Sequence, residues 1–377
     1  MSMKLLTFFG TRPEIIRLSR IIPLLDRLCE HTLVHTGQNY DPNLSDIFFR
    51  DLGLRPPNLH LGVRGGNFAE QLAQIFVRSE QILRQASPDR VLILGDTNSG
   101  MAAVIAARMG IPVYHLEAGN RCYDDRVPEE INRRIIDHSS TVLLPYTGRS
   151  KDNLVREGIA REKIFVVGNP IHEVLQANES GIAASGVHAR LGLVPGEYFV
   201  VTLHRAENVD ARERLESIVN GLRLVVETYR KPMVLSLHPR TADKVRAFSI
   251  DFSSRYFQVI EPLGFFDFVS LERRALCVLT DSGTVQEECA ILKVPNVTVR
   301  DVTERPETLE CGSNLLTGAE PESILRAVNM ATQDGPAWNP PSEYLEPNVS
   351  RIVANIVLGY RHTAACDVRP RSEFKVA

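Results

Sequence analysis

The chain has 377 residues, of which 44% are hydrophobic and 24% charged, with a formal net charge of -3. This length predicts two domains of ordinary globular composition, and the acidic balance argues against a nucleic-acid-binding protein. No apolar run approaches the roughly 20 residues of a membrane span, and the N-terminal run is too short for a signal peptide. Six scattered cysteines without a CxxC pair or a histidine cluster predict reduced thiols in the cytoplasm and no metal site.

Short apolar runs that end in small or polar residues recur through the first half, as in a parallel sheet covered on both faces. We expect strands at 5–9, 32–35, 91–94, 113–116, 142–144 and 164–167, and helices at about 13–25, 67–86 and 128–138. Asn67 and Glu70 have the spacing of a capping box at the start of the second helix. The alternation of strand and helix predicts a doubly wound α/β fold.

Charged residues follow three of these predicted strands. Arg12, Asp96 and Glu117 come directly after the runs that end at Phe9, Leu94 and Leu116. Doubly wound sheets bind ligands beyond the carboxyl ends of their strands. We therefore expect the three side chains to converge on one crevice.

Further charged residues lie at two predicted helix starts. Arg12 and Arg17 flank the first helix, where cations oppose the helix dipole. They indicate either an anionic ligand or ordinary surface arginines. Glu129 and Arg133 are four residues apart on a later helix, so they either join the site or form a plain surface ion pair.

The alternation of predicted strands and helices is interrupted between the two halves of the chain. Gly168-Asn-Pro170 marks the end of a first domain at 1–170, and we place an interdomain linker in the polar stretch 176–197. A second α/β domain is expected at 176–349, with strands at 198–203, 232–237, 258–260 and 276–279. The last helical pattern, at about 350–377, is compatible with a helix that packs back on the first domain.

Polar residues also end the strands of the second half. His204 and His238 follow two successive strands, and although a lone histidine is usually packed or on the surface, two at neighbouring strand ends favour a ligand role. Asp281-Ser-Gly283 opens a helix, where free backbone N–H groups and the dipole favour an anion. Ser282 would add a donor, Gly283 would admit a phosphate, and Arg305 follows the next strand. The stretch is either a diphosphate-binding corner or an ordinary capped helix.

Several common motifs are absent. The sequence has no GxGxxG, no GxxxxGK[ST] and no GxSxG, which weakens dehydrogenase, P-loop NTPase and α/β-hydrolase interpretations. The remaining classes are glycosyl transfer, sugar epimerisation and non-catalytic binding of a sugar nucleotide.

Seven motifs occur in order across roughly residues 3–318. They are Gly10-Thr-Arg-Pro-Glu14, Gly95-Asp-Thr97, Glu117-Ala-Gly119, Pro128-Glu-Glu-Ile-Asn-Arg133, His204-Arg205, Asp281-Ser-Gly283 with Gln286-Glu-Glu288, and Arg300-Asp-Val-Thr-Glu-Arg-Pro-Glu307. Together they resemble the non-hydrolysing UDP-N-acetylglucosamine 2-epimerases. The resemblance implies two Rossmann-like domains facing a cleft, the glycosyltransferase-B fold. It also implies a homodimer that acts on a UDP-N-acetylhexosamine without an added redox cofactor, a membrane or a nucleic acid.

The resemblance implies a reaction in which UDP and the C2 proton leave to give a 2-acetamidoglycal. UDP then returns, and a proton is added to the other ring face. Carried over, Asp96, Glu117 and Glu129 would form the acid–base and oxocarbenium-stabilising set, with Glu130 as the alternative to Glu129. The diphosphate and UDP contacts would come from Arg12, Arg17, Arg133, His204, His238, Phe268 at the uracil, Ser282, Gly283, Thr284, Glu288 and Arg305.

This chain departs from the family's pattern at three places. Arg17 replaces the usual lysine, keeping the charge but changing its geometry, and Gly283-Thr284 replaces Gly-Gly. Gln38-Asn39 replaces a Gln-His pair in a loop that binds a second, activating UDP-sugar in some members.

Three loops are more similar to the branch that forms UDP-N-acetyl-L-fucosamine from its 6-deoxy-L-talo precursor. They are His-Thr-Gly-Gln-Asn-Tyr40, Leu-Gly-Asp-Thr-Asn-Ser99 and Glu-Ala-Gly-Asn-Arg-Cys122. The reaction type is therefore better defined than the sugar. A retaining glycosyltransferase of the same fold and a catalytically silent UDP-sugar binder are the alternatives.

Overall fold

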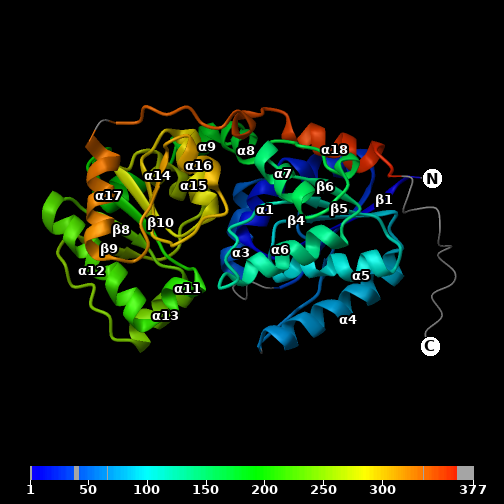
Figure 1. Ribbon diagram of the computed structural model, residues 1–377, viewed down its shortest axis with the longest axis horizontal. Helices are drawn as coiled ribbons and strands as arrows, with labels where there is room; N and C mark the ends of the chain where they lie inside the picture. The colour runs from blue at the N-terminus through cyan, green and yellow to red at the C-terminus, as the bar shows by residue number, and fades with distance from the viewer. Residues whose placement is uncertain (1, 38–41, 66, 334, 363–377) are drawn as a thin grey trace. The chain divides into compact units, whose positions relative to one another are not determined.

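Figure 1 shows the computed structural model, which describes residues 2–37, 42–65, 67–333 and 335–362. The chain divides into two compact units: unit 1 combines Met1–Val174 with the segment from Glu346 onward, and unit 2 is Leu175–Leu345. Each unit holds one six-stranded parallel sheet flanked by helices, which confirms the predicted doubly wound α/β class. Among the described residues, none of the helices combines the length and apolar character that crossing a membrane requires.

The sheet of unit 1 has the strand order β3-β2-β1-β4-β5-β6. Its strands are β1 (Lys4–Phe9), β2 (Glu30–His35), β3 (Leu59–His60), β4 (Arg90–Leu94), β5 (Val113–Leu116) and β6 (Val142–Leu144). All residues of β4 are buried, as expected for a strand with helices on both faces. The winding reverses between β1 and β4, so the carboxyl ends of these two strands mark the switch point where such folds bind ligands.

Helices cover both faces of this sheet (Figure 1). They are α1 (Arg12–Leu18), α2 (Ile21–Leu28), α3 (Pro42–Asp51), α4 (Phe68–Ala86), α5 (Ala102–Arg108), α6 (Pro128–Ser139), α7 (Gly148–Arg156), α8 (Ile171–Ala177) and α18 (Val349–Gly359), with short 3₁₀ turns η1 (Asn98–Met101) and η2 (Arg161–Lys163). The side chain of Asn67 caps α4 by accepting the backbone N–H of Glu70, as its spacing predicts. Late in the chain, α18 returns to pack on α2.

The sheet of unit 2 has the order β12-β11-β10-β7-β8-β9, which is the same winding with its switch point between β7 and β10. Its strands are β7 (Phe199–Thr202), β8 (Met233–Ser236), β9 (Phe257–Ile260), β10 (Cys277–Thr280), β11 (Asn296–Thr298) and β12 (Asn314–Leu316). Phe199 and Val201 belong to the core on one face of the sheet, whereas Val200 belongs to the core on the other. This alternation follows from the two-residue period of a strand.

The helices of unit 2 bury both of these faces. They are α9 (Glu179–Ala183), α10 (Val187–Leu191), α11 (Ala206–Val209), α12 (Arg212–Tyr229), α13 (Pro239–Ala247), α14 (Phe265–Arg273), α15 (Gly283–Leu292), α16 (Pro306–Glu310) and α17 (Pro321–Gln333), with η3 (Ser342–Leu345). The core on one face is completed by α12 and α17, and the core on the other by α10, α14 and α15.

Three predicted elements differ from the structure. The helix expected at 13–25 breaks into α1 and α2, because Pro23 has no N–H to donate to the carbonyl of Ser19. The stretch expected as the interdomain linker, 176–197, contains α9, α10 and the end of α8, and it belongs to unit 2. The strand expected at 164–167 is reduced to one bridge between Leu143 and Ile164.

Candidate active site

The carboxyl ends of β1 and β4 carry two of the predicted site residues, Arg12 and Asp96. Arg12 begins α1 directly after β1, and its guanidinium carbon lies 5.9 Å from the ring centre of Phe48. Asp96 follows β4 and accepts a 2.8 Å hydrogen bond from Nε of Arg133 on α6. The Arg133 side chain is 3% exposed and that of Asp96 is 22% exposed. A buried cation therefore orients a carboxylate that solvent still reaches.

Glu117 follows β5 and is the most constrained of the predicted catalytic carboxylates. Its Oε2 lies 3.4 Å from Nη1 of Arg17 and accepts a 3.2 Å hydrogen bond from the Tyr146 hydroxyl. Its Oε1 accepts a 3.3 Å bond from the side-chain amide of Asn120. Its backbone φ of 72° lies in the left-handed region, which non-glycine residues rarely adopt and which occurs disproportionately at functional sites.

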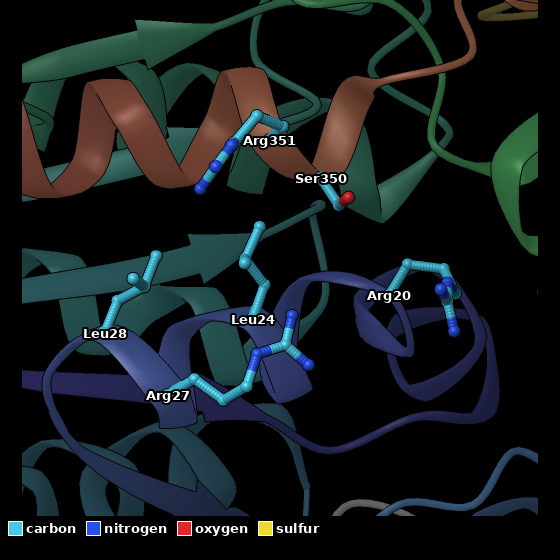
Figure 2. Close-up of a pocket in the computed structure, with 6 residues that line it drawn as sticks. All are labelled: Arg20, Leu24, Arg27, Leu28, Ser350 and Arg351. Carbon is cyan, nitrogen blue, oxygen red and sulfur yellow. The ribbon is translucent and has the colours of Figure 1, made fainter.

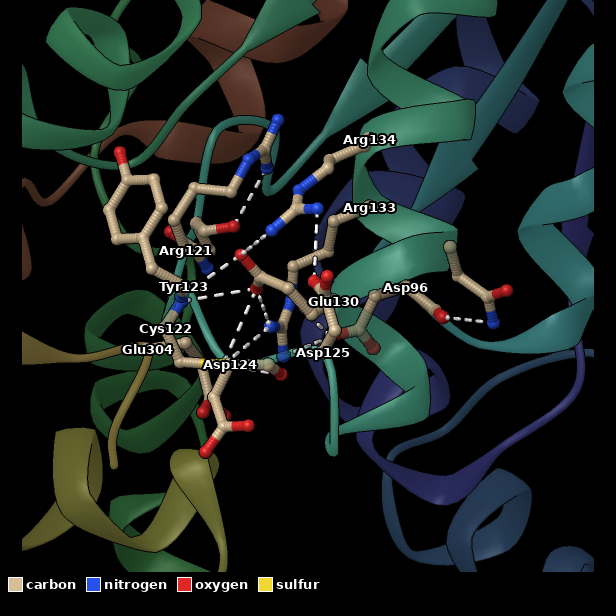
Figure 3. A network of polar contacts seen from close by, with 12 residues as sticks. Asp96, Arg121, Cys122, Tyr123, Asp124, Asp125, Glu130, Arg133, Arg134 and Glu304 are labelled. Carbon is tan, nitrogen blue, oxygen red and sulfur yellow. Dashed lines mark hydrogen bonds and ion pairs between the residues drawn. The ribbon is translucent and has the colours of Figure 1, made fainter. Parts of the chain in front are cut away.

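The first turn of α6 distinguishes the two adjacent glutamates. Glu130 is buried and accepts the backbone N–H groups of Cys122 (3.1 Å) and Tyr123 (3.0 Å), and it pairs with Arg133 at 2.7 Å (Figure 3). Burial opposes its ionisation, but these N–H groups and the guanidinium outweigh it and lower the pKa of Glu130. Glu129 is partly exposed on the same turn. Glu129 is therefore the better candidate for moving a proton, and Glu130 holds the loop before α6.

A buried carboxylate that the sequence analysis left without a role, Glu14, joins the ends of β1 and β4. Its side chain accepts the backbone N–H groups of Gly10 (2.5 Å) and Thr11 (2.7 Å) and the hydroxyl of Thr97 (2.6 Å). Burial raises the pKa of Glu14 to about 7, although these donors oppose the shift. The signal for it in the sequence was the capping-box spacing of Thr11 and Glu14.

We expect Glu14→Gln to change how stability depends on pH. Because the folded-state pKa is raised from 4.5 to about 7, the folded protein binds this proton more tightly than the unfolded chain does. The stabilising contribution is complete below pH 4.5 and is lost as the pH rises through 7, by on the order of 3 kcal/mol. Urea unfolding across this pH range should show that loss in the wild type and in the exposed-site control Glu162→Gln, but not in Glu14→Gln. If the unfolding free energy depended on pH in the same way in all three proteins, the raised pKa would not belong to Glu14.

A second buried network supports the loops around Glu117. Asp137 on α6 contacts His115 Nδ1 (2.7 Å), Arg121 Nη2 (2.7 Å) and the backbone N–H of Gly119 (3.2 Å). His115 Nε2 lies 2.8 Å from the carbonyl oxygen of Gly95, so the ring bridges Asp137 and the end of β4. Burial disfavours the Asp137 charge, but these partners outweigh it and lower the pKa of Asp137. The network ties the ends of β4 and β5 to α6.

At the switch point of unit 2, Asp281 organises the loop after β7. Its buried carboxylate accepts the backbone N–H groups of His204 and Arg205, each at 3.0 Å, and the side-chain amide of Asn208 at 3.1 Å. His204 Nδ1 also lies 3.2 Å from Asp281, and the His204 side chain is 39% exposed. The ring centres of His204 and His238 are 6.2 Å apart. The structure thus brings together the two histidines that follow successive strands.

The start of α15 lies beside the same strand end. The hydroxyl groups of Ser282 and Thr284 are 3.0 Å apart. A Cβ atom on Gly283 would lie only 2.5 Å from Oε1 of Glu304 and 3.6 Å from Cζ of Arg305. A side chain at this position would therefore require the Glu304 carboxylate to move, so Gly283 allows Glu304 to lie close to the start of α15.

The remaining predicted nucleotide contacts lie deeper in unit 2. Arg305 is buried and pairs with Glu287 on α15. Glu288 is also buried and forms a hydrogen bond with Glu272, whose pKa is raised by burial and by the charge of Glu288. Phe268 on α14 is half-buried against the core. Gln38 and Asn39 lie outside the described residues.

The two units therefore present different functional groups at their switch points. In unit 1, Asp96 and Glu117 supply carboxylates beside the cations of Arg133 and Arg17, and Glu129 lies in the first turn of α6. In unit 2, a helix start and exposed His204 supply donors for an anion. The described residues contain no group of three His, Cys, Asp or Glu side chains placed to hold a metal ion.

Comparison with known proteins identifies the family. The sequence model of the UDP-N-acetylglucosamine 2-epimerase family matches residues 25–358. The UDP-N-acetylglucosamine 2-epimerase of Methanocaldococcus jannaschii is 42% identical over 348 residues, covering 90% of this chain and 95% of that protein. The UDP-2,3-diacetamido-2,3-dideoxy-D-glucuronate 2-epimerase of Pseudomonas aeruginosa is 37% identical, covering 86% of this chain and 91% of that protein.

A solved structure agrees with the sequence matches. The crystal structure of the M. jannaschii enzyme in complex with UDP-GlcNAc and UDP superposes with a TM-score of 0.88 at 42% identity, covering 93% of this chain and 99% of that one. The resemblance inferred from the motifs is confirmed. This chain belongs to the UDP-N-acetylglucosamine 2-epimerase family and is an isomerase.

Proposed function

We propose that the protein converts UDP-N-acetylglucosamine into UDP-N-acetylmannosamine by eliminating and re-adding UDP. The observation that carries this proposal is the pair of carboxylates Asp96 and Glu117, which follow β4 and β5; we add Glu129 of α6 as the third member of the set. Two of them contact buried arginines, at 2.8 Å for Asp96 and 3.4 Å for Glu117. Such a site can move a proton on a carbon next to a leaving group.

In the first step, a carboxylate removes the C2 proton while the C1–O bond breaks. The electrons of the C2–H bond form the C1=C2 double bond, and UDP leaves with the electrons of the C1–O bond. The C2–H is very weakly acidic. The C1–O bond must therefore break further than the C2–H bond in the transition state, and a nearby carboxylate stabilises the positive charge that develops at C1. UDP then re-adds at C1, and a carboxylic acid returns a proton to C2 from the other face.

We assign nucleotide binding to unit 2. The start of α15 and Ser282 would accept the diphosphate, and His204 would assist its departure. Glu288 and Arg305 would hold the ribose and neighbouring groups, with Phe268 and His238 beside the nucleotide. We also assign Arg12 and Arg17 a role in stabilising the negative charge of the departing diphosphate.

The parent N-acetylglucosamine substrate is favoured over the branch sugars. The 42%-identical relative is a UDP-N-acetylglucosamine 2-epimerase, and its crystal structure contains UDP-GlcNAc. The 37%-identical P. aeruginosa relative acts on a diacetamido glucuronate, so one family site accommodates more than one hexosamine. The 6-deoxy-L-talo precursor is the second candidate, because three loops of this sequence are similar to that branch.

Proton NMR in D₂O tests the reaction. We expect UDP-N-acetylglucosamine to gain deuterium at C2 as a manno product forms, because the returned proton comes from exchangeable groups. A retaining glycosyltransferase would show no C2 exchange without an acceptor, and a silent binder would show none at all. If C2 stays protonated with both this sugar and the 6-deoxy-L-talo sugar, the 2-epimerase assignment is wrong.

We also propose that the enzyme is a cytoplasmic homodimer. The homodimer follows from the family resemblance. The five cysteines within the described residues are all free thiols, which suits a reducing compartment. Sedimentation velocity of the purified protein would give the mass of the assembly, and a monomer at micromolar concentration would contradict the dimer.

A further inference from the structure

A groove of about 450 Å³ lies in unit 1 between α2 and α18, on elements that none of the active-site residues occupies. Its lining is Arg20, Leu24, Arg27, Leu28, Ser350 and Arg351. Figure 2 shows side chains from both helices facing this space. The volume is within the range of small-molecule sites, roughly 300 to 1,000 Å³.

The charge of the groove has one sign. Arg20, Arg27 and Arg351 line it together with two leucines and a serine, and no acidic side chain does. Within residues 2–37, 42–65, 67–333 and 335–362, none of the three arginines forms an ion pair or hydrogen bond through its side chain. Three uncompensated cations from two helices make a local positive potential that favours an anion.

One acid of α2 and one of α8 that contacts α18 already have other partners. Asp26 of α2 pairs with His31 at 2.7 Å and with Arg55 at 2.9 Å. Glu173 accepts the backbone N–H of Ser350 at 2.8 Å and also its hydroxyl, so its carboxylate caps the start of α18. Within the described part of the chain, neither carboxylate forms an ion pair with an arginine of the groove.

The lining also defines the chemistry of that ligand. Guanidinium groups offer paired donors that match the oxygens of a phosphate. Leu24 and Leu28 add an apolar surface, and Leu28 is 49% exposed, so a ligand with an apolar or planar part would cover it. We propose that this groove is a second anion site, which binds a phosphate-bearing molecule with an apolar or planar group. Either a soluble nucleotide or the headgroup of an anionic lipid supplies this chemistry.

Hydrogen–deuterium exchange measured by mass spectrometry can locate such binding within the full chain. The probes are ADP, inorganic pyrophosphate, and vesicles of phosphatidylcholine and phosphatidic acid in equal amounts. We expect slower exchange in peptides covering 21–28 and 349–359 with at least one probe. Protection by ADP or pyrophosphate indicates a soluble ligand, and protection by vesicles alone indicates a lipid headgroup.

Matched variants separate a site from general surface charge. The groove variant carries Arg20→Ala, Arg27→Ala and Arg351→Ala, and the control carries Arg64→Ala, Arg108→Ala and Arg161→Ala, three exposed arginines of unit 1 outside the groove. Losing charge-assisted hydrogen bonds should weaken binding by about tenfold or more per arginine. The groove variant should lose the protection while its ligand-free exchange stays at the wild-type level.

Two results would overturn the proposal. One is unchanged exchange in both helices with all three probes at millimolar concentration, with protection of peptides near 281–288 by UDP showing that the protein is active in binding. The other is equal loss of protection in the groove and control variants. Neither result depends on the epimerase reaction, so the proposed function stands or falls separately.

Discussion

Glu117→Gln is expected to lower kcat by about 10²- to 10⁴-fold, the usual contribution of a positioned proton-transfer group. The substitution keeps the size of the side chain but removes the charge that faces Arg17, and the single amide oxygen can replace only one of the two acceptors that Tyr146 and Asn120 now contact. Asp96→Asn and Glu129→Gln should have losses in the same range. Deuterium incorporation at C2 and product formation are the measurements.

Measuring UDP binding by the three variants distinguishes a loss of proton transfer from a loss of structure. UDP affinity, measured by calorimetry, should remain largely intact in all three variants, because we assign nucleotide binding to unit 2. Glu162→Gln, which changes an exposed glutamate of unit 1, is the matched control and should turn over at the wild-type rate. Near-normal turnover in the three carboxylate variants would falsify the assignment of the site.

Asp137→Asn is expected to destabilise the protein by about 3 to 5 kcal/mol, the usual cost of removing one partner from a buried ionic network. The Asp137 side chain is completely buried, where it is the counter-ion of Arg121 and also contacts His115. An amide nitrogen in its place would meet a donor instead of providing an acceptor. Urea unfolding at neutral pH gives the difference, and the exposed Asp152→Asn on α7 is the control.

The same variant should show a defined pH dependence. Because the pKa of Asp137 is lowered from 3.8 in the folded state, its contribution to stability is present above pH 3.8 and is lost as the pH falls through the folded-state value. The difference between wild type and Asp137→Asn should therefore shrink in acid. A difference below about 0.5 kcal/mol at neutral pH would show that the network does not carry this charge.

The sequence predicted the elements whose signals are local. β4 and β10 are continuous apolar runs in fully buried strands, and the residues that follow them, Asp96 and Asp281, do lie at the switch points. The helix break after Ser19 also had a local cause, in Pro23, but the apolar periodicity on both sides of it concealed the break. Helices α9 and α10 have only five residues each, too few for periodicity to distinguish them from a loop.

Site residues could be predicted from the sequence only where they belong to a family motif. Glu14 and Thr97 are 83 residues apart, and His115 and Asp137 are 22 apart, so no spacing rule shows that they touch. The role of Glu130 could not be separated from that of its neighbour, because the contacts that hold it come from the backbone of Cys122 and Tyr123. Partners that meet through tertiary folding require the coordinates.

The split of unit 1 across the chain has a consequence for synthesis on the ribosome. Unit 2 ends at Leu345, so it can be completed before α18 emerges. The C-terminal segment then supplies α18 as the partner of α2, and the carbonyls of Val357 and Tyr360 as acceptors for Arg90 and Tyr114. Unit 1 is therefore completed only after unit 2, and a nascent chain lacks the α18 partner of α2 until residues 349–359 have been made.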